Sequence, residues 1–171
     1  PGLLDGEDYG DATPFSVTIF HSGGTGARPW RDGLSATAFP SGVRNTPVEI
    51  TESIAPVIFH RKEFREGSGG DGQYRGGHGQ VIEISHAEGA PFAIFALFDR
   101  VDHPARGRNG GADGAPGTVR LTSGKTLKTK GKQIIPAGER LLMELPGGGG
   151  YGDPAERDPG LREKDLANDL N

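Results

Sequence analysis

Five polar side chains in two glycine- and proline-rich segments are the strongest candidates for chemistry in this sequence. They are Arg28, Asp32, Arg44, Asn45 and Glu49. Arginine keeps a permanent positive charge and presents a planar fork of donors that matches a carboxylate or a transient phosphate. An asparagine can donate to and accept from an amide in one plane. The two carboxylates could orient the arginines, as supporting groups rather than acid–base catalysts.

Both segments also have a plainer interpretation. In residues 23–33, backbone N–H groups and a guanidinium could hold an anion, but the Gly-Lys-Ser/Thr ending of a P-loop is absent. Residues 39–49 place polar groups just before an expected strand, where they could line a site. In either segment the same groups could instead only stabilise turns. We keep both interpretations open.

Other kinds of active site find less support. The chain has no cysteine, which excludes disulfides, thiolate metal sites and a cysteine nucleophile. Five histidines are spread along the chain: His21, His60, His78, His86 and His103. No two of them have a spacing typical of metal ligands, and no Gly-X-Ser-X-Gly elbow is present. We therefore assign no catalytic residue, cofactor or metal within this chain.

The charge pattern argues against nucleic-acid and membrane partners. Residues 118–132 hold five basic and no acidic side chains, but the whole chain has a net charge of −4. Without interleaved aromatics for base stacking, this stretch predicts a solvated, lysine-rich hairpin. No apolar run approaches the ~18 residues of a membrane span.

Because the sequence starts at Pro1 without an initiator methionine or signal core, we expect a cytoplasmic piece of a longer polypeptide.

The distribution of apolar residues predicts a mainly β fold. Thirty glycines and 13 prolines exclude a long helical bundle. Alternating or short apolar runs predict strands over residues 15–19, 48–52, 57–60, 81–86, 91–98, 118–121, 126–128 and 140–145. We expect a single domain over residues 1–171, an antiparallel sandwich or barrel-like structure with Gly/Pro-rich loops.

Two segments carry more specific expectations. The run over residues 91–98 is apolar on both faces, which predicts a central strand covered on both sides. Its expected core residues are Phe92, Ile94, Phe95 and Leu97. At the end of the chain, Asp158 as N-cap and Pro159 predict one short helix. The apolar face of this helix is formed by Leu166, Ala167 and Leu170.

The glycine-rich segment over residues 146–154 is costly to order. Four consecutive glycines lose much conformational entropy on folding, so an ordered structure needs a compensating contact. This requirement favours an interface at the segment over a plain loop.

Taken together, the special segments resemble the C-terminal part of the large subunit of the hydantoinase B/oxoprolinase family. The matching segments run in order along nearly the whole chain: residues 23–29 (GGTGARP), 32–33 (DG), 39–49 (FPSGVRNTPVE), 68–79 (SGGDGQYRGGHG), 109–111 (NGG), 146–153 (PGGGGYGD) and 154–159 (PAERDP). Each motif alone is modest, but the ordered set is specific.

The resemblance implies an activity for a larger complex. Family members open cyclic amides such as hydantoin, 5-oxoproline or a related lactam with ATP, and some relatives carboxylate ketones. The implied partners are the N-terminal part of the same subunit, a hydantoinase A-like subunit that binds ATP, and the small-molecule cyclic amide. ATP and a divalent metal would belong to that complex, so we expect this chain alone to be inactive. A non-catalytic binding module and an interface domain, including that of a ketone carboxylase, remain the alternatives.

Overall fold

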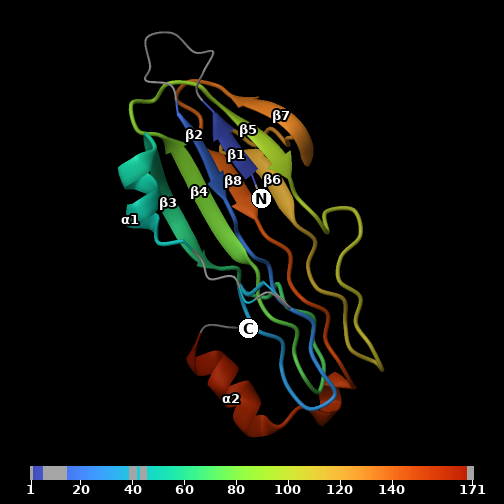
Figure 1. Ribbon diagram of the computed structural model, residues 1–171. Helices are drawn as coiled ribbons and strands as arrows, with labels where there is room; N and C mark the ends of the chain where they lie inside the picture. Colours follow the sequence, from blue (N-terminus) through green and yellow to red (C-terminus); the bar gives the residue numbers. More distant parts are fainter. Residues whose placement is uncertain (1, 6–14, 39–41, 43–45, 169–171) are drawn as a thin grey trace.

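The computed structural model (Figure 1) describes residues 2–5, 15–38, 42 and 46–168. Its strands are β1 (Gly2–Asp5), β2 (Ser16–Ile19), β3 (Val57–Phe64), β4 (Gln80–His86), β5 (Phe92–Leu97), β6 (Thr118–Leu121), β7 (Lys130–Ile135) and β8 (Leu141–Glu144). Its helices are α1 (Val48–Ile54), the 3₁₀ helix η1 (Pro154–Glu156) and α2 (Pro159–Ala167). None of the described helices is long and apolar enough to cross a membrane.

The strands form two antiparallel sheets that pack face to face as a sandwich. One sheet has the order β2-β1-β5-β7 and the other β3-β4-β8-β6. Ile82 and Ile84 of β4 share one core cluster with Phe92 and Ile94 of β5, and each is at most 2% exposed. Burying each such side chain stabilises the fold by about 1.5–3 kcal/mol. The expected antiparallel β fold is confirmed, and of the two architectures it is the sandwich.

The short C-terminal helix is also confirmed. The Asp158 side chain accepts a hydrogen bond from the N–H of Gly160 at 2.8 Å, and Pro159 occupies the first turn. A cap of this kind stabilises a helix by about 1 kcal/mol. Of the expected apolar face, Leu166 is exposed and Leu170 lies outside the described residues.

The expected strand over residues 48–52 is wrong, because this segment forms α1. Its alternation of Val48 and Ile50 is typical of a strand, yet Ile50 is exposed. The segment instead buries Thr51 and Ala55, which lie one helical turn apart and on the same side as Val48. The helix therefore buries a different set of side chains from the set that the alternation suggested.

The second arm of the lysine-rich hairpin also differs from expectation. Residues 126–128 pair with β6 only through an isolated bridge between Arg120 and Thr126. The chain then crosses to the other sheet and forms β7, in which only Ile135 is buried. Because β7 has no apolar alternation, its residue pattern did not predict a strand.

The prediction that β5 is covered on both faces is wrong for its outer face. Phe92 and Ile94 are buried, but Phe95 and Leu97 are 39% and 51% exposed. Successive side chains of a strand point to opposite faces, and only the even-numbered set of β5 meets the other sheet. The strand buried on both faces is β4, where every residue except Ser85 is buried.

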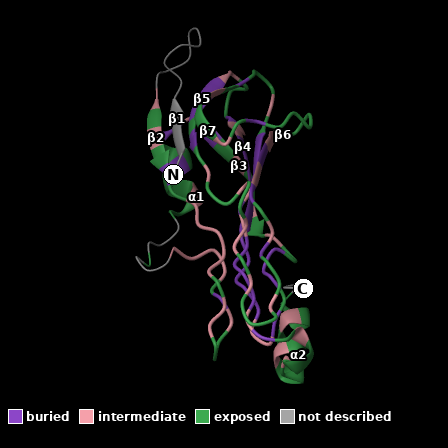
Figure 2. Cartoon of the chain, turned by 90° about the vertical axis from the view of Figure 1, so that its right-hand side faces the viewer, coloured by how far each residue is buried: buried purple, intermediate pink, exposed green. Residues whose placement is uncertain are grey.

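Below the sandwich, glycine-rich loops and the segment after β8 run side by side as a bundle (Figures 1 and 2). We call this the glycine bundle; it comprises residues 23–37, 66–79, 103–117 and 146–152. The last segment bonds to the other three: Gly149 accepts from the N–H of Ala27 at 2.8 Å, and Gly150 donates to the carbonyl of Ala112 at 2.9 Å. Figure 2 shows buried residues continuing from the sandwich into the bundle.

The bundle is built from direct contacts between backbones. A Cβ on Gly147 would lie 1.6 Å from the carbonyl oxygen of Ser68, and one on Gly148 would lie 1.9 Å from that of Thr25. Only glycine fits such contacts, as at the crowded axis of the collagen triple helix. The compensating contact expected for residues 146–154 is therefore made within this chain, by the other glycine-rich segments.

Two alanine substitutions in the first bundle segment test this packing. A Cβ on Gly24 would lie 1.7 Å from the carbonyl oxygen of Gly77, whereas one on Gly26 would lie 3.8 Å from its nearest neighbour. We expect Gly24→Ala to lower the free energy of unfolding by about 2–3 kcal/mol or more. The matched control Gly26→Ala should change it by less than about 1 kcal/mol. Urea unfolding measures both values, and equal unfolding midpoints would contradict the proposed backbone contacts.

Candidate functional site

The structure separates the site residues that the sequence suggested. Arg28 lies at the tip of the first bundle segment, where its backbone pairs with Arg31 through N···O distances of 2.9 and 3.2 Å. Asp32 lies on the returning arm of the same loop. Glu49 is exposed on α1, beside the sandwich and away from that loop (Figure 1). Two further candidates lie outside the described residues: Arg44 and Asn45.

Several backbone N–H groups of residues 23–33 hold the bundle together. Gly24 donates to the carbonyl of Pro146 at 2.9 Å, and Gly33 donates to that of Arg75 at 2.7 Å. Donors already used in this way are not directed at a ligand. The plainer interpretation, in which the segment stabilises local structure, therefore describes these N–H groups.

A cleft of about 720 Å³ nevertheless lies beside this segment. One side is formed by residues 23–26 and the other by a loop that contributes Arg100, His103, Arg106 and Arg108. We call it the basic cleft. Three permanent positive charges in one concave site favour an anion, such as a carboxylate or a phosphoryl group. Arg28 is not one of its lining residues.

The loop of the basic cleft is fixed by the glycine bundle. Arg108 donates its backbone N–H to the carbonyl of Gly150 at 2.9 Å. Arg100 has a positive φ of 56°, a conformation that is uncommon outside glycine and is often found at functional sites. At the edge of the cleft, a hydrogen bond from Lys130 lowers the pKa of Asp99. The feature of the sequence that could have indicated a binding loop here is the group of arginines between residues 100 and 108.

Asp32 takes part in an ion-pair network that the sequence did not suggest. Both oxygens of its carboxylate accept from the guanidinium of Arg157, at 2.8 and 2.9 Å. Arg157 also donates to Asp165 of α2 at 2.6 Å, and Asp165 accepts from Arg75 at 3.1 and 3.3 Å. These four residues are the arginine–aspartate network. It connects two bundle segments to the C-terminal helix.

The network is strongly charged although it is largely buried. The Arg157 and Asp165 side chains are 8% and 13% exposed. Burial acts to raise the pKa of Asp32, but hydrogen bonds from Arg157 and from the backbone N–H of Arg75 outweigh it, so the pKa is lowered. The hydrogen bond to Asp32 in turn raises the pKa of Arg157. Asp32 therefore orients an arginine, as a supporting group would, and that arginine is Arg157.

The described residues also contain no group of three or more His, Asp or Glu side chains placed to hold a metal ion. A metal of the larger complex therefore stays a prediction that rests on the family resemblance.

Replacing Arg157 tests whether the network docks α2. Lysine keeps the charge but cannot bridge Asp32 and Asp165 with a planar fork. We expect Arg157→Lys to increase hydrogen exchange of the α2 amides about ten-fold, the equivalent of roughly 1.4 kcal/mol. The control is Arg162→Lys. Within the described part of the chain, the exposed Arg162 side chain makes one hydrogen bond, to the carbonyl of Pro154 at 2.6 Å. Equal exchange in the two variants would show that the network does not hold the helix.

Acid should remove the contribution of Asp32. Its folded pKa is lowered below the ordinary 3.8, so the ionised form stabilises the fold above that value. The contribution is lost as the pH falls through the folded pKa. We expect Asp32→Asn to cost about 2–3 kcal/mol at pH 7 and progressively less below pH ~3.8. Urea unfolding of both proteins at several pH values measures the difference, and a gap that is independent of pH would refute this assignment.

Comparison with known proteins identifies the family. The model of the family described as hydantoinase B/oxoprolinase matches residues 3–154. The chain is 38% identical to 5-oxoprolinase 1 of Arabidopsis thaliana over 156 residues, which cover 88% of this chain and 12% of that protein. The chain thus spans about an eighth of the length of this curated relative.

Two solved structures share the fold. The ATP-dependent caprolactamase from Pseudomonas jessenii superposes with a TM-score of 0.78 and 25% identity, over 99% of this chain and 31% of that one. An acetone carboxylase structure without nucleotide superposes with a TM-score of 0.71 and 20% identity, over 99% and 28%. The sandwich and glycine bundle are therefore part of a recurrent architecture, and the chain belongs to the hydantoinase B/oxoprolinase family.

Proposed function

We propose that this chain is the C-terminal domain of a hydantoinase B-like subunit that opens cyclic amides hydrolytically with ATP in the cytoplasm. The substrate would be hydantoin, 5-oxoproline or a related lactam, and a hydantoinase A-like subunit would bind the ATP. The observation that supports this most is the family match over residues 3–154. A 5-oxoprolinase and a caprolactamase among the similar proteins support a cyclic amide as substrate.

The chemistry of the basic cleft suits such a reaction. An amide is a poor electrophile. Transfer of the γ-phosphoryl group of ATP to its oxygen, with release of ADP, would make the carbon open to attack by water. The ring C–N bond would then break, the nitrogen would take up a proton, and phosphate would leave. Ring opening leaves a carboxylate, and arginines bind carboxylate and phosphoryl oxygens with paired hydrogen bonds. Arg106 and Arg108 are exposed in the cleft and free of ion pairs within the described residues. They would hold the anion rather than move protons.

The five residues singled out from the sequence have substrate-binding or supporting roles in this proposal. Arg28 and Arg44 would contact the substrate or the neighbouring subunit, and Asn45 would recognise the amide plane. Asp32 acts by orienting Arg157, and Glu49 would act on the face of the sandwich that carries α1. ATP and a divalent metal would be bound elsewhere in the complex.

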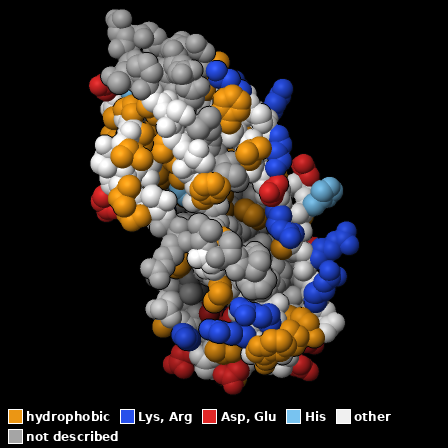
Figure 3. Space-filling model, in the orientation of Figure 1, with side chains coloured by type: hydrophobic (Ala, Val, Ile, Leu, Met, Phe, Trp, Pro, Cys, Tyr) orange, Lys and Arg blue, Asp and Glu red, His pale blue; other side chains and the backbone are white. Residues whose placement is uncertain are grey.

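One observation favours the alternative of a non-catalytic interface domain. Phe95 and Leu97 of β5 and Ile134 of β7 expose 39–57% of their surface on the outer side of one sheet. Figure 3 shows several hydrophobic side chains at the surface of the sandwich. Exposed apolar groups of this kind are typical of contact surfaces. The sandwich would therefore dock against the rest of the subunit even if the basic cleft takes no part in catalysis.

The complete complex tests the proposal. We expect the full-length protein with its hydantoinase A-like partner to open 5-oxoproline, hydantoin or a lactam only when ATP is present. The double variant Arg106→Gln/Arg108→Gln should lower turnover about ten-fold or more, because charge-assisted hydrogen bonds contribute about 1.5–3 kcal/mol each. Arg162→Gln is the control, and Tm is measured for all proteins.

Three outcomes would bear on these candidates. No ATP-dependent ring opening with any of these amides would refute the hydrolase function. Unchanged turnover in the double variant, with the reaction intact, would leave the domain as an interface. Turnover by the 171-residue chain alone would contradict the need for the larger complex.

A further inference from the structure

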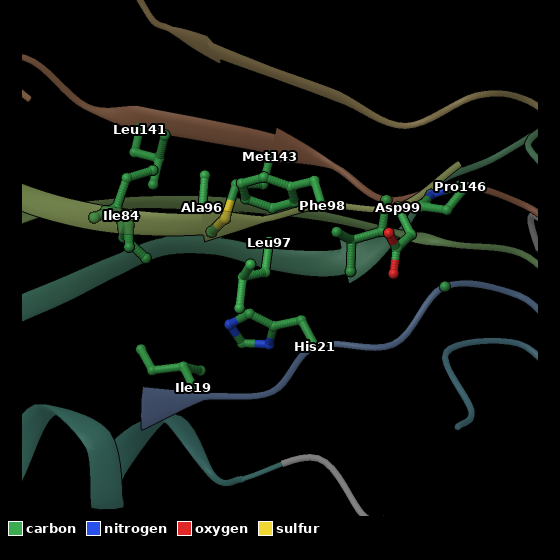
Figure 4. Close-up of a pocket in the computed structure, with 13 residues that line it drawn as sticks. Ile19, His21, Ile84, Ala96, Leu97, Phe98, Asp99, Leu141, Met143 and Pro146 are labelled. Carbon is green, nitrogen blue, oxygen red and sulfur yellow. The ribbon is translucent and has the colours of Figure 1, made fainter. Parts of the chain in front are cut away.

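The loop between β5 and β6, which carries the arginines of the basic cleft, is folded as a hairpin. It begins at Asp99, which lies beside Pro146 where the sandwich ends (Figure 4). Further along, the N–H of Gly114 donates to the carbonyl of Ala105 at 2.8 Å. The two arms of the loop therefore run antiparallel, away from the sandwich and toward a tip at residues 108–111.

The tip of this hairpin is a tight turn with Asn-Gly at its centre. The N–H of Gly111 donates to the carbonyl of Arg108 at 2.9 Å. Between them, Asn109 and Gly110 have φ angles of 51° and 94°. Two positive φ angles in succession are typical of a type I′ turn, for which Asn-Gly is a preferred pair. The Asn109 side chain also bonds to the hydroxyl of Tyr151. The turn therefore fixes the end of the arm that carries Arg108.

The two arginines of this arm lie on the same side of it. Arg106 and Arg108 line the basic cleft, whereas Gly107 between them does not. This alternation is that of an extended chain, in which successive side chains point to opposite sides. On the side away from the cleft, a Cβ on Gly107 would lie 2.0 Å from the carbonyl oxygen of Gly111. The direction of both arginines therefore depends on how the backbone at Gly107 is oriented.

The carboxylate of Asp113 holds the backbone at this position. Its Oδ1 accepts the N–H of Gly107 at 2.8 Å. Asp113 does not line the basic cleft, and within the described residues it forms no ion pair with an arginine. It therefore leaves both guanidinium groups available. Its negative charge nevertheless lowers the positive potential around the arginines, which by itself would weaken the binding of an anion.

We propose that Asp113 is a positioning residue for the basic cleft: its carboxylate fixes the backbone at Gly107 and so directs Arg106 and Arg108 at one bound anion. This inference rests on the proposed function, in which the two arginines hold a carboxylate or phosphoryl group. A hydrogen bond from an N–H to a carboxylate is stronger than one to a neutral acceptor. Donors that are fixed before binding lose less entropy when the ligand arrives. Asp113 therefore strengthens anion binding although its own charge opposes it.

The opposite signs of these two effects give the test. We would titrate the 171-residue chain with inorganic phosphate and follow the backbone amide signals of Arg106 and Arg108 by ¹⁵N NMR. We expect Asp113→Ala to weaken phosphate binding about five- to ten-fold, although it removes a negative charge. Asp113→Asn keeps an acceptor oxygen without the charge. This variant should bind phosphate as tightly as the wild type or more tightly.

The matched control is Asp102→Ala. Asp102 is exposed on the same loop and does not line the basic cleft. Its removal should leave the phosphate affinity unchanged or raise it by less than about two-fold. Thermal unfolding is measured for all variants, and the Tm of Asp113→Ala should stay within about 3 °C of the wild type. A loss of affinity at an unchanged Tm separates positioning of the arginines from general destabilisation.

A measurement on the wild type decides the question if Asp113→Ala does not fold. The amide of Gly107 should exchange with solvent about ten-fold more slowly than that of Gly110, which donates to no acceptor within the described part of the chain. If the 171-residue chain does not fold alone, phosphate is titrated into the longer protein that carries it, by calorimetry and with the same variants.

Three results would overturn the proposal. The first is phosphate binding by Asp113→Ala that equals or exceeds that of the wild type, which would make Asp113 only a repelling charge. The second is equal exchange of the Gly107 and Gly110 amides. The third is no saturable binding of phosphate by the wild type, which would remove anion binding from the basic cleft. None of these measurements uses ATP or turnover, so their failure is distinct from failure of the hydrolase function, which loss of ring opening would show.

Discussion

Direct contact between backbones in the glycine bundle is the constraint on which the rest of the structure depends. At Gly147 and Gly148 the neighbouring carbonyl oxygens lie where a side chain would begin. Segments that approach so closely can exchange hydrogen bonds without belonging to a sheet, and these bonds offset the entropy lost by ordering glycine. The same contacts fix the loop that carries Arg106 and Arg108, because its N–H and C=O groups bond to the central segment. A site built on the bundle is therefore positioned by backbone.

The arginine–aspartate network closes the far end of this arrangement. Its charges are largely withdrawn from water, which is stabilising only where each charge has partners of good geometry. Arg157 meets this condition by contacting Asp32 and Asp165 at once. Removal of one partner would leave a buried charge, so the network ties the position of α2 to that of the first bundle loop. α2 has no buried residue of its own, and electrostatic contacts take the place of an apolar face.

The sequence predicted those parts of the molecule that follow from local pattern. Most strands of the sandwich show alternating apolar residues, and Asp158 with Pro159 marked the start of α2. Local pattern failed where tertiary contacts determine the secondary structure. Val48 and Ile50 alternate within a helix, and β7 has almost no buried face. The ordered glycine motifs identified the family, but spacing alone cannot show which glycines touch. For the same reason Asp32 was singled out while its partner Arg157, far away in sequence, was not.

The position of the basic cleft follows from a change in packing distance. Stacked sheets lie about 10 Å apart because side chains fill the space between them. In the glycine bundle, backbones touch directly at glycines such as Gly147 and Gly148. The segments that leave β2, β5 and β8 must therefore converge as they pass from the side-chain packing of the sandwich to the backbone contacts of the bundle. Gly23, Asp99 and Pro146 lie at this transition and line the basic cleft. The space between the segments is incompletely filled where the sandwich meets the bundle. Neither the interlocking side chains of the sandwich nor the backbone contacts of the bundle continue across this junction.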